Sequence, residues 1–158
     1  MTPPTAVFLA RHRLVDNRLV VTGNVEHGDE RGRELGFPTA NLALEDEVAR
    51  DGVWAGLVTL EGGQVYGAAV SIGRRTTFYG RAGVRLLEAH LLDFSGDLYG
   101  HRVSVDLRHL LRLQRRFTDA GALIGQIACD VDDARAWCAA HFELVGPLGL
   151  AGPVAASA

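Results

Sequence analysis

Alternating apolar and polar residues predict that most of the chain forms short β-strands. The segment 18–27 is rich in β-branched residues and ends in glycine and polar residues, as a strand does where it enters a loop. From Gly52, the run GVWAGLVTLEGGQVYGAAVSIG predicts two strands around the turn 61–64, because glycine tolerates the positive φ angles of a tight hairpin. A further strand pair, LLEAHLLDF followed by GDLYGHRVSVDLRHLL, is predicted to join near residues 95–97.

The hydrophobic period changes near residue 118. Apolar residues then recur every three or four positions, which predicts one amphipathic helix with Thr118 or Asp119 as its N-cap. Many short strands followed by one helix favour a closed or nearly closed antiparallel barrel with the helix packed against it, since closure removes exposed strand edges. The apolar face of this helix is predicted to consist of Leu123, Ile124, Ile127, Val131, Ala134 and Trp137 or Cys138.

Length and charge narrow the possible functions. The 158 residues suffice for one domain, and the formal net charge of −3 is scattered, so the basic stripe of a nucleic-acid binder is missing. All 16 basic residues are arginine, which excludes a Schiff-base lysine and the lysine-bearing phosphate loop. No apolar run approaches the roughly 18 residues of a membrane span. Cys129 and Cys138, nine residues apart, are expected to be buried small residues in a protein of the reducing cytoplasm.

The segment HGDERGRELGFPTANLAL concentrates glycine, hydroxyl and amide groups. Gly28, Gly32 and Gly36 recur at a spacing of four before Thr39 and Asn41. Glycines let backbone N–H groups approach an anion, while a hydroxyl and an amide two residues apart can turn toward one hard cation. The pattern indicates a phosphate-and-magnesium site, although such a segment can also be only a loop.

The segment EAHLLDF places Glu88, His90, Leu92 and Phe94 on one face at period two. Polar groups beside large apolar ones suggest a cleft, where a carboxylate can accept a proton from an attacking hydroxyl. Alternatively, both polar side chains simply face solvent. The other histidines lack zinc-site spacing and no GxSxG motif occurs, so neither a zinc enzyme nor a serine hydrolase is indicated.

Taken together, six segments resemble the riboflavin kinase family over residues 18–140: GNVEHGDERGRELGFPTANL, GVWAGLV, SIGRRTTF, LEAHLLDFSGDLYGHRVSV, LRLQRRF and QIACDVDDAR. The resemblance implies a mainly β fold, a six-stranded antiparallel Greek-key β-barrel with one long C-terminal α-helix packed against it. We expect this domain over residues 18–142, after a lead-in over 1–17. The glycine, proline and small residues of 143–158 predict a flexible tail.

The resemblance also implies an activity. Family members transfer the γ-phosphate of ATP to the ribityl 5′-hydroxyl of riboflavin, giving FMN and ADP, with Mg²⁺. The chain looks like the kinase module that bacteria usually carry behind a nucleotidyltransferase domain in a bifunctional FAD synthetase. The (H/T)xGH-type motif of that second domain is missing, so FAD synthesis is not expected. We expect a cytoplasmic monomer with neither nucleic-acid nor membrane partners.

The same resemblance assigns roles to individual residues. Glu88 matches the base that accepts the hydroxyl proton, and Thr39 and Asn41 match the magnesium ligands. The matching nucleotide-binding positions are Gly28, Arg33, Thr39, Asn41, Leu91, Asp93 and Tyr99, with Leu91 and Asp93 acting largely through backbone groups. The flavin-binding positions are Arg112, Arg115 and Phe117.

Two positions depart from the family pattern. Thr76 replaces the proline of SIG-x-x-P-T-F, and Gln114 stands where a glutamate is common. These departures leave open an alternative, a flavin-binding regulator or carrier with weak or no kinase activity. A different phosphoryl donor also stays open, because donor choice depends on loop contacts.

Overall fold

The computed structural model describes residues 9–28, 31–34, 36–45, 49–74, 77–78 and 81–141. The expected tail over 143–158, the first eight residues of the expected lead-in, and Thr76 lie outside the described residues.

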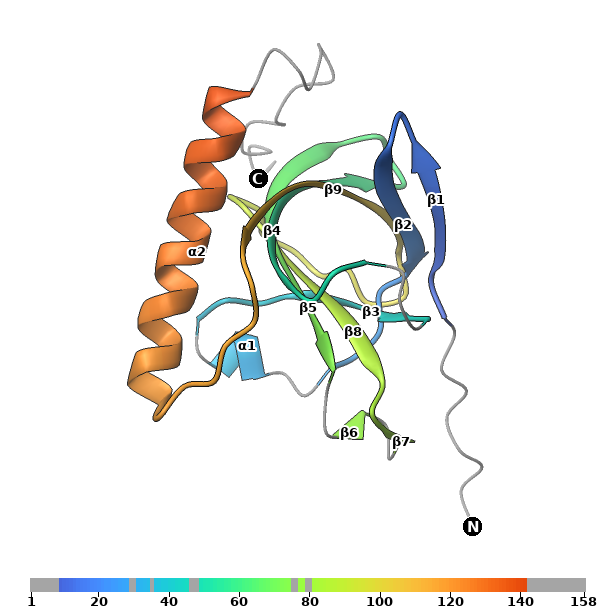
Figure 1. Cartoon of the computed structure of the whole chain (residues 1–158). Helices are drawn as coiled ribbons and strands as arrows, with labels where there is room; N and C mark the ends of the chain where they lie inside the picture. The colour runs from blue at the N-terminus through green and yellow to red at the C-terminus, as the bar shows by residue number, and fades with distance from the viewer. Residues whose placement is uncertain are drawn as a thin grey trace, which may run out of the picture.

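Seven antiparallel strands form one sheet that curls into a barrel (Figure 1), in the order β1-β2-β9-β4-β5-β8-β3. The two ends of this order meet, because the Glu26 N–H donates to the Asn41 carbonyl (2.9 Å) and the Ala10 N–H donates to the Ala43 carbonyl (2.8 Å). The strands are β1 (Arg11–Val15), β2 (Arg18–Asn24), β3 (Ala40–Leu44), β4 (Gly52–Leu60), β5 (Val65–Arg74), β8 (Arg85–Leu91) and β9 (Arg102–Arg112). Three short elements complete the fold: α1 (Arg31–Glu34) and the paired β6 (Thr77–Phe78) and β7 (Arg81–Ala82).

The mainly β barrel is confirmed, but the sheet has seven strands where six were expected. The additional strand, β1, lies within the expected lead-in and forms a hairpin with β2. Asp16 and Asn17 connect the two strands with φ angles of 49° and 61°. These angles are typical of a two-residue hairpin turn, in which aspartate and asparagine are common.

The barrel interior is filled by alternate residues of its strands. On β8, Leu87, Ala89 and Leu91 point inward, whereas Glu88 and His90 between them are only half-buried and point outward. β-Branched residues dominate the fully buried set, as expected for a tightly curled sheet. Its largest members are Leu42, Ile72, Leu87, Val21, Val58, Val70, Val103 and Val105.

The predicted helix is confirmed as α2 (Ala120–Ala140), and Asp119 is its N-cap because its side chain accepts a hydrogen bond from the Ala122 N–H (2.8 Å). The helix lies along the outside of the barrel and packs on β4 and β5 (Figure 1). It approaches closely: a Cβ added at Gly67 of β5 would lie 2.9 Å from the Cys138 sulfur. Among the described residues, no helix is long and apolar enough to cross a membrane.

Two predictions are wrong: that Ile124 belongs to the buried face of this helix, and that both cysteines are buried. Ile124 is 37% exposed, because it lies beyond the edge of the apolar stripe that contacts the sheet. Cys129 is exposed and only Cys138 is buried, since nine residues place the two cysteines on opposite sides of the helix. Burial raises the pKa of the Cys138 thiol, which therefore stays protonated near neutral pH.

The predicted hairpin over 52–74 is confirmed as β4 and β5, with Gly63 at φ 86° in the turn. The second predicted strand pair is wrong, because β8 pairs with β3 and β5, whereas β9 pairs with β2 and β4. The connection over residues 92–101 is longer than a hairpin turn and carries the chain to another part of the barrel.

Candidate functional site

A row of polar side chains crosses three neighbouring strands on the outer face of the barrel. Asn41 of β3 pairs with Glu88 of β8, and Glu88 pairs with Ser71 of β5. Directly paired residues share one face of a sheet, so strand register alone brings these three side chains together. Asn41 is 5% exposed, whereas Glu88 is half-buried.

The Phe37–Asn41 segment is held against this row. His90 Nδ1 donates to the Pro38 carbonyl (2.9 Å), and the Phe37 ring meets the His90 ring edge-on. Thr39 Oγ1 donates to Asn41 Oδ1 (3.3 Å), which places the two oxygen-bearing groups side by side.

Gly28 lies directly over the Asn41 amide. A Cβ added at Gly28 would lie 2.1 Å from Asn41 Nδ2, far inside contact distance. Only glycine leaves the amide in its present place, which is a packing reason for a glycine in the HGDERGR segment.

Two cavities meet at Thr39, which lines both. The first, here called the loop cavity, has a volume of about 480 Å³. The second, here called the helix cavity, has a volume of about 440 Å³ and contains Glu88. The loop cavity is lined by Val25, Arg33, Pro38, Thr39, Ala40, Leu91, Phe94 and residues 95–99. The helix cavity is lined by Phe37, Thr39, Asp51, Val53, Ala69, Ser71, Gly73, Arg74, Glu88, His90, Arg112, Gln114, Arg115, Phe117, Leu123, Ile127, Asp130 and Val131.

The loop cavity owes its shape to the connection between β8 and β9. The Gly100 N–H donates to the Val25 carbonyl and the Val25 N–H donates to the His101 carbonyl, both at 2.9 Å. The Asp97 side chain accepts from the Tyr99 N–H (2.9 Å), and the Tyr99 ring stacks on His27 with the ring centres 3.8 Å apart. The wall is therefore a loop fixed by backbone bonds and one ring stack.

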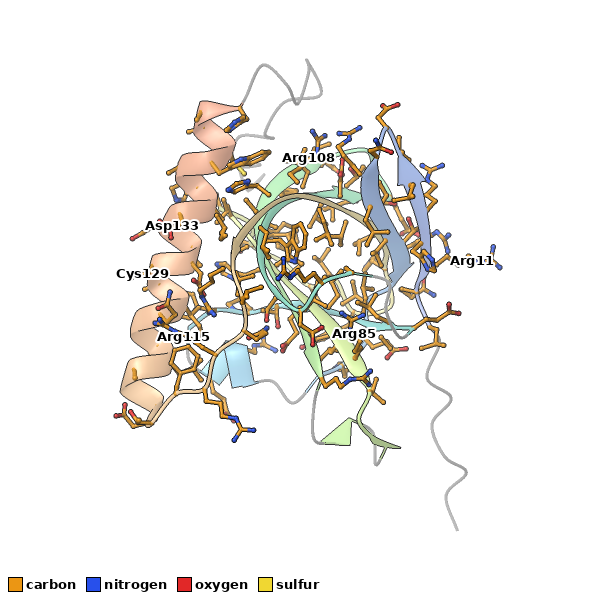
Figure 2. All side chains as sticks on the ribbon, viewed as in Figure 1. Arg11, Arg85, Arg108, Arg115, Cys129 and Asp133 are labelled. Carbon is orange, nitrogen blue, oxygen red and sulfur yellow. The ribbon has the colours of Figure 1, made fainter. Side chains whose placement is uncertain are left out.

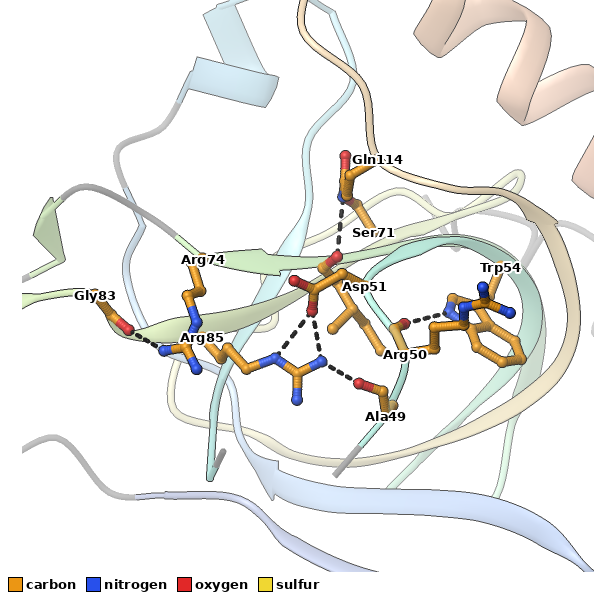
Figure 3. Close-up of polar contacts among 10 residues, drawn as sticks. Ala49, Arg50, Asp51, Trp54, Ser71, Arg74, Gly83, Arg85 and Gln114 are labelled. Atoms are coloured by element: carbon orange, nitrogen blue, oxygen red, sulfur yellow. Dashed lines mark hydrogen bonds and ion pairs between the residues drawn. The ribbon is translucent and has the colours of Figure 1, made fainter. Parts of the chain in front are cut away.

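The helix cavity is bounded by side chains that hold one another. Arg112 Nε and Nη2 donate to the two oxygens of Asp130 on α2, at 2.7 and 2.6 Å. The guanidinium groups of Arg112 and Arg115 lie 5.9 and 5.3 Å from the centre of the Phe117 ring. Gln114 Nε2 donates to Ser71 Oγ at 2.9 Å (Figure 3). It also donates to the Ile72 carbonyl at 2.9 Å.

A buried arginine forms an ion pair with one residue of the helix cavity. Arg85, 5% exposed, belongs to the inward-facing residues of β8, and its Nε and Nη2 donate to Asp51 Oδ1 at 2.9 and 2.5 Å (Figures 2 and 3). Its Nη2 also contacts the Ala49 carbonyl. Asp51 lines the helix cavity, so the core of the barrel and this cavity share one ion pair.

The structure brings together most of the residues expected at the site. Glu88, Arg112, Arg115 and Phe117 line the helix cavity, and Thr39 lines both cavities. Arg33, Leu91 and Tyr99 line the loop cavity, while Gly28 and Asn41 lie against each other beside Thr39.

Asp93 lies apart from the others, because neither cavity lining contains it and its side chain is exposed. Its Oδ2 accepts a hydrogen bond from Arg135 Nη1 (2.7 Å), which lowers the pKa of the Asp93 carboxyl below its usual value of 3.8. Asp93 also has a φ of 57°, which ends the strand alternation. Phe94 therefore packs edge-on against Tyr66 of the barrel core, and the expectation that it shares the outer face with Glu88 is wrong.

Several residues of the helix cavity were not identified from the sequence. The sequence around Ser71 and Asp51 does not mark either residue as part of a site. Ser71 reaches the cavity through its strand register with Glu88, and Asp51 reaches it because it directly precedes β4. Asp130 did carry a signal: it lies three residues after Ile127 and four before Ala134, on the apolar face of α2. A charged residue on such a face is expected to have a specific partner.

A barrel with two adjoining cavities beside a carboxylate suits the transfer of a group between two bound molecules. The family model Flavokinase, described as riboflavin kinase, matches residues 15–138. The chain therefore belongs to the riboflavin kinase family.

Curated relatives agree with this assignment. The bifunctional riboflavin kinase/FMN adenylyltransferase of Escherichia coli K12 is 42% identical over 124 residues, which cover 77% of this chain and 39% of that protein. The RNA-binding riboflavin kinase RibR of Bacillus subtilis is 34% identical over 128 residues, which cover 80% of this chain and 53% of that protein. The chain thus spans less than half the length of the bifunctional relative.

Two solved structures are similar in fold. A riboflavin kinase from Trypanosoma brucei superposes with a TM-score of 0.53 at 26% identity, covering 81% of this chain and 89% of that one. A macrolide-efflux protein from Streptococcus pneumoniae, so described, superposes with a TM-score of 0.67 at 34% identity, covering 77% of this chain and 40% of that one.

Proposed function

We propose that this chain transfers the γ-phosphate of ATP to the ribityl 5′-hydroxyl of riboflavin, giving FMN and ADP. The observation that carries the proposal is that the two cavities share Thr39 as a lining residue. Glu88 lines one of them, the helix cavity. In such a transfer the protein chiefly aligns the two reactants and stabilises charge, which requires adjoining sites for donor and acceptor.

The walls of the two cavities suit different ligands. The helix cavity offers Phe37, Phe117, Leu123 and Ile127, apolar surfaces for a flat aromatic ring system such as the isoalloxazine of riboflavin. The loop cavity is lined largely by the loop residues 95–99, with Arg33, which suit a nucleotide and its phosphates. We therefore assign the flavin to the helix cavity and the nucleotide to the loop cavity.

Glu88 is the proposed base. Its carboxylate lines the cavity assigned to riboflavin and is paired in register with Asn41, next to Thr39. In this position it accepts the proton of the 5′-hydroxyl as that oxygen forms its bond to the γ-phosphorus. The bond from the γ-phosphorus to the bridging oxygen breaks, and ADP leaves with the electron pair.

Thr39 and Asn41 are the proposed holders of a magnesium ion. Their side-chain oxygens lie 3.3 Å apart, and neutral oxygen donors supplemented by substrate phosphates are what Mg²⁺ accepts in such sites. When bound, the ion supplies positive charge to the phosphate oxygens. The described residues contain no group of three His, Cys, Asp or Glu side chains arranged for a metal, so the donors offered are those of the Thr39–Asn41 pair.

We further infer a cytoplasmic monomer without nucleic-acid or membrane partners. The scattered net charge of −3 suits small-molecule ligands better than a polyanion. The exposed thiol of Cys129 suits a reducing compartment. The expected domain over 18–142 is extended in this proposal to include β1.

The test is direct. Purified protein is incubated with riboflavin and Mg-ATP, and FMN is measured by chromatography, with CTP and GTP as alternative donors. We expect FMN with ATP. Folded protein that quenches riboflavin fluorescence but forms no FMN with any donor would contradict the proposal and favour a flavin carrier.

A further inference from the structure

The segment QIACDVDDAR on α2 contains three polar residues that reach beyond the helix. Gln126, Asp130 and Arg135 contact Arg115, Arg112 and Asp93, respectively. The proposed transfer gives none of these three residues a role. Two of them act on the wall of the helix cavity.

Asp130 is the centre of this arrangement. It is 4% exposed although it is charged, and its two oxygens accept from Nε and Nη2 of Arg112 in a two-pronged ion pair. A carboxylate as buried as this requires such a partner, because a buried charge without one is strongly destabilising. The geometry of this fork fixes the orientation of the Arg112 guanidinium plane.

Gln126 extends the contact to a second arginine. Its Nε2 donates to Asp130 Oδ1 (2.9 Å), and its Oε1 accepts from Arg115 Nη2. One carboxylate thus orders Arg112 directly and Arg115 through an amide. Both guanidinium groups lie near the ring of Phe117, so the segment 112–117 is held as one wall.

We propose that Asp130 is a positioning residue for the acceptor substrate, acting through Arg112 and, by way of Gln126, through Arg115. The wall of the helix cavity is then formed before the ligand enters, which lowers the ordering cost of binding. The positive charge of Arg112 is already balanced by Asp130, so this wall offers flat guanidinium faces suited to an uncharged aromatic ring. This inference rests on the proposed function.

The test compares Asp130→Asn with Asp133→Asn in the full chain. Asp133 is an exposed aspartate of the same helix that faces away from the barrel (Figure 2), and its substitution is the matched control. We expect Asp130→Asn to raise the riboflavin Kd and KM about tenfold, the effect of losing a charged hydrogen bond. The Kd for ATP and the kcat at saturating riboflavin should stay within about twofold, because Asp130 does not line the donor cavity and acts through Arg112 and Gln126.

A second variant, Gln126→Ala, keeps the Arg112–Asp130 ion pair and removes the amide that links Asp130 to Arg115. We expect it to raise the riboflavin Kd about threefold, less than Asp130→Asn, because the hydrogen bond between Gln126 and Arg115 is exposed to solvent. If Asp130→Asn does not fold, the riboflavin Kd of Gln126→Ala tests the inference instead. A riboflavin Kd equal to that of the wild type in the folded variant, or a loss in kcat alone, would overturn the inference.

The two proposals fail differently. Wild-type protein that does not bind riboflavin would contradict the proposed function. Wild-type protein that binds and phosphorylates riboflavin, with Asp130→Asn indistinguishable from it, would contradict only the role of Asp130.

Discussion

The two cavities are of similar volume, about 480 and 440 Å³, yet their walls are built in opposite ways. Much of the loop cavity is one connection, residues 92–101, held by backbone hydrogen bonds to Val25. The helix cavity takes its walls from strands of the barrel, the segment 112–117 and α2, all joined by side-chain hydrogen bonds.

This difference teaches where substitutions act. A wall formed by one loop depends on the backbone conformation of that loop. The connection over residues 92–101 contains Asp93, Gly96 and Gly100 at positive φ. A wall of side chains depends on each hydrogen-bonded pair and on α2, which supplies Asp130 and Gln126. Glycine substitutions should therefore weaken the binding of one ligand and leave the binding of the other unchanged. Substitution of Glu88 should change the affinity for neither riboflavin nor ATP.

The largest effect is expected from Glu88→Gln. The amide keeps the shape of the side chain but cannot accept the hydroxyl proton, so kcat should fall by roughly 10²- to 10⁴-fold. Both ligands should still bind, as measured by riboflavin fluorescence and calorimetry with ATP. Glu61→Gln in the exposed β4–β5 turn is the matched control. Turnover above a tenth of the wild-type value would remove Glu88 from the role of base.

Next in size is Gly28→Ala. The new methyl group would lie 2.1 Å from Asn41 Nδ2, so the amide must move away from Thr39. We expect turnover to fall by roughly ten- to a hundredfold, because small displacements of aligned groups are costly, with weaker ATP binding and an unchanged riboflavin Kd.

The control for this variant is Gly125→Ala, where an added Cβ meets nothing within 4 Å. Wild-type turnover in Gly28→Ala would show that the position of the Asn41 amide is unimportant.

Gly67→Ala should affect the other cavity. Its Cβ would lie 2.9 Å from the Cys138 sulfur and 3.2 Å from Leu92 Cδ1, which pushes α2 off the sheet. We expect a loss of about 1–3 kcal/mol in the free energy of unfolding, measured in urea, and weaker binding of riboflavin than of ATP.

Adding Cys138→Ala to Gly67→Ala removes the sulfur and should restore part of the stability. Gly125→Ala, on the exposed side of α2, should instead stabilise by about 0.5–1 kcal/mol. Equal stability of the wild type and Gly67→Ala would contradict the close approach of helix and sheet.

The smallest effect is expected from Arg135→Gln, which removes the link between α2 and Asp93. Because Arg135 lowers the pKa of the Asp93 carboxyl, the pair stabilises the folded state above about pH 3.8 and loses this effect as the pH falls through the lowered value. The pair is exposed, so a few tenths of a kcal/mol are expected at pH 7.

Urea unfolding of the wild type and Arg135→Gln at pH 7 and pH 3 would measure this difference. It should shrink at the lower pH and in high salt. A difference that grows on acidification would contradict the assigned pair.

Much of the fold could be predicted because local signals agreed with the tertiary structure. Asp119 before a run of apolar residues at helical spacing marked the start of α2, and the glycines at 62–63 marked the β4–β5 turn. β1 was missed because its residues RHRLV show no buried face; it is a strand because it pairs with β2. Pairing between distant segments leaves no local pattern.

The site was less predictable from the residues themselves. Residue chemistry suggested a metal pair at Thr39 and Asn41 and a base at Glu88, and the family resemblance made these roles specific, but only the β3–β8 register explains why Asn41 and Glu88 lie together. Ser71 joins them through the same register. Asp130 was overlooked although a charge on an apolar helix face was visible in the sequence.

The Arg85–Asp51 pair limits how this protein can be redesigned. Asp51 is an obvious position to change for a bulkier flavin analogue, because it lines the helix cavity. Its removal would leave the Arg85 guanidinium, 5% exposed, without its carboxylate, and a buried charge without a counter-charge is destabilising even though the Asp51 side chain is itself 44% exposed. Enlarging the cavity at this wall therefore requires that Asp51 and Arg85 be replaced together. A change in substrate range at this position is thus tied to a change in the barrel core, and the two have to occur in a single step.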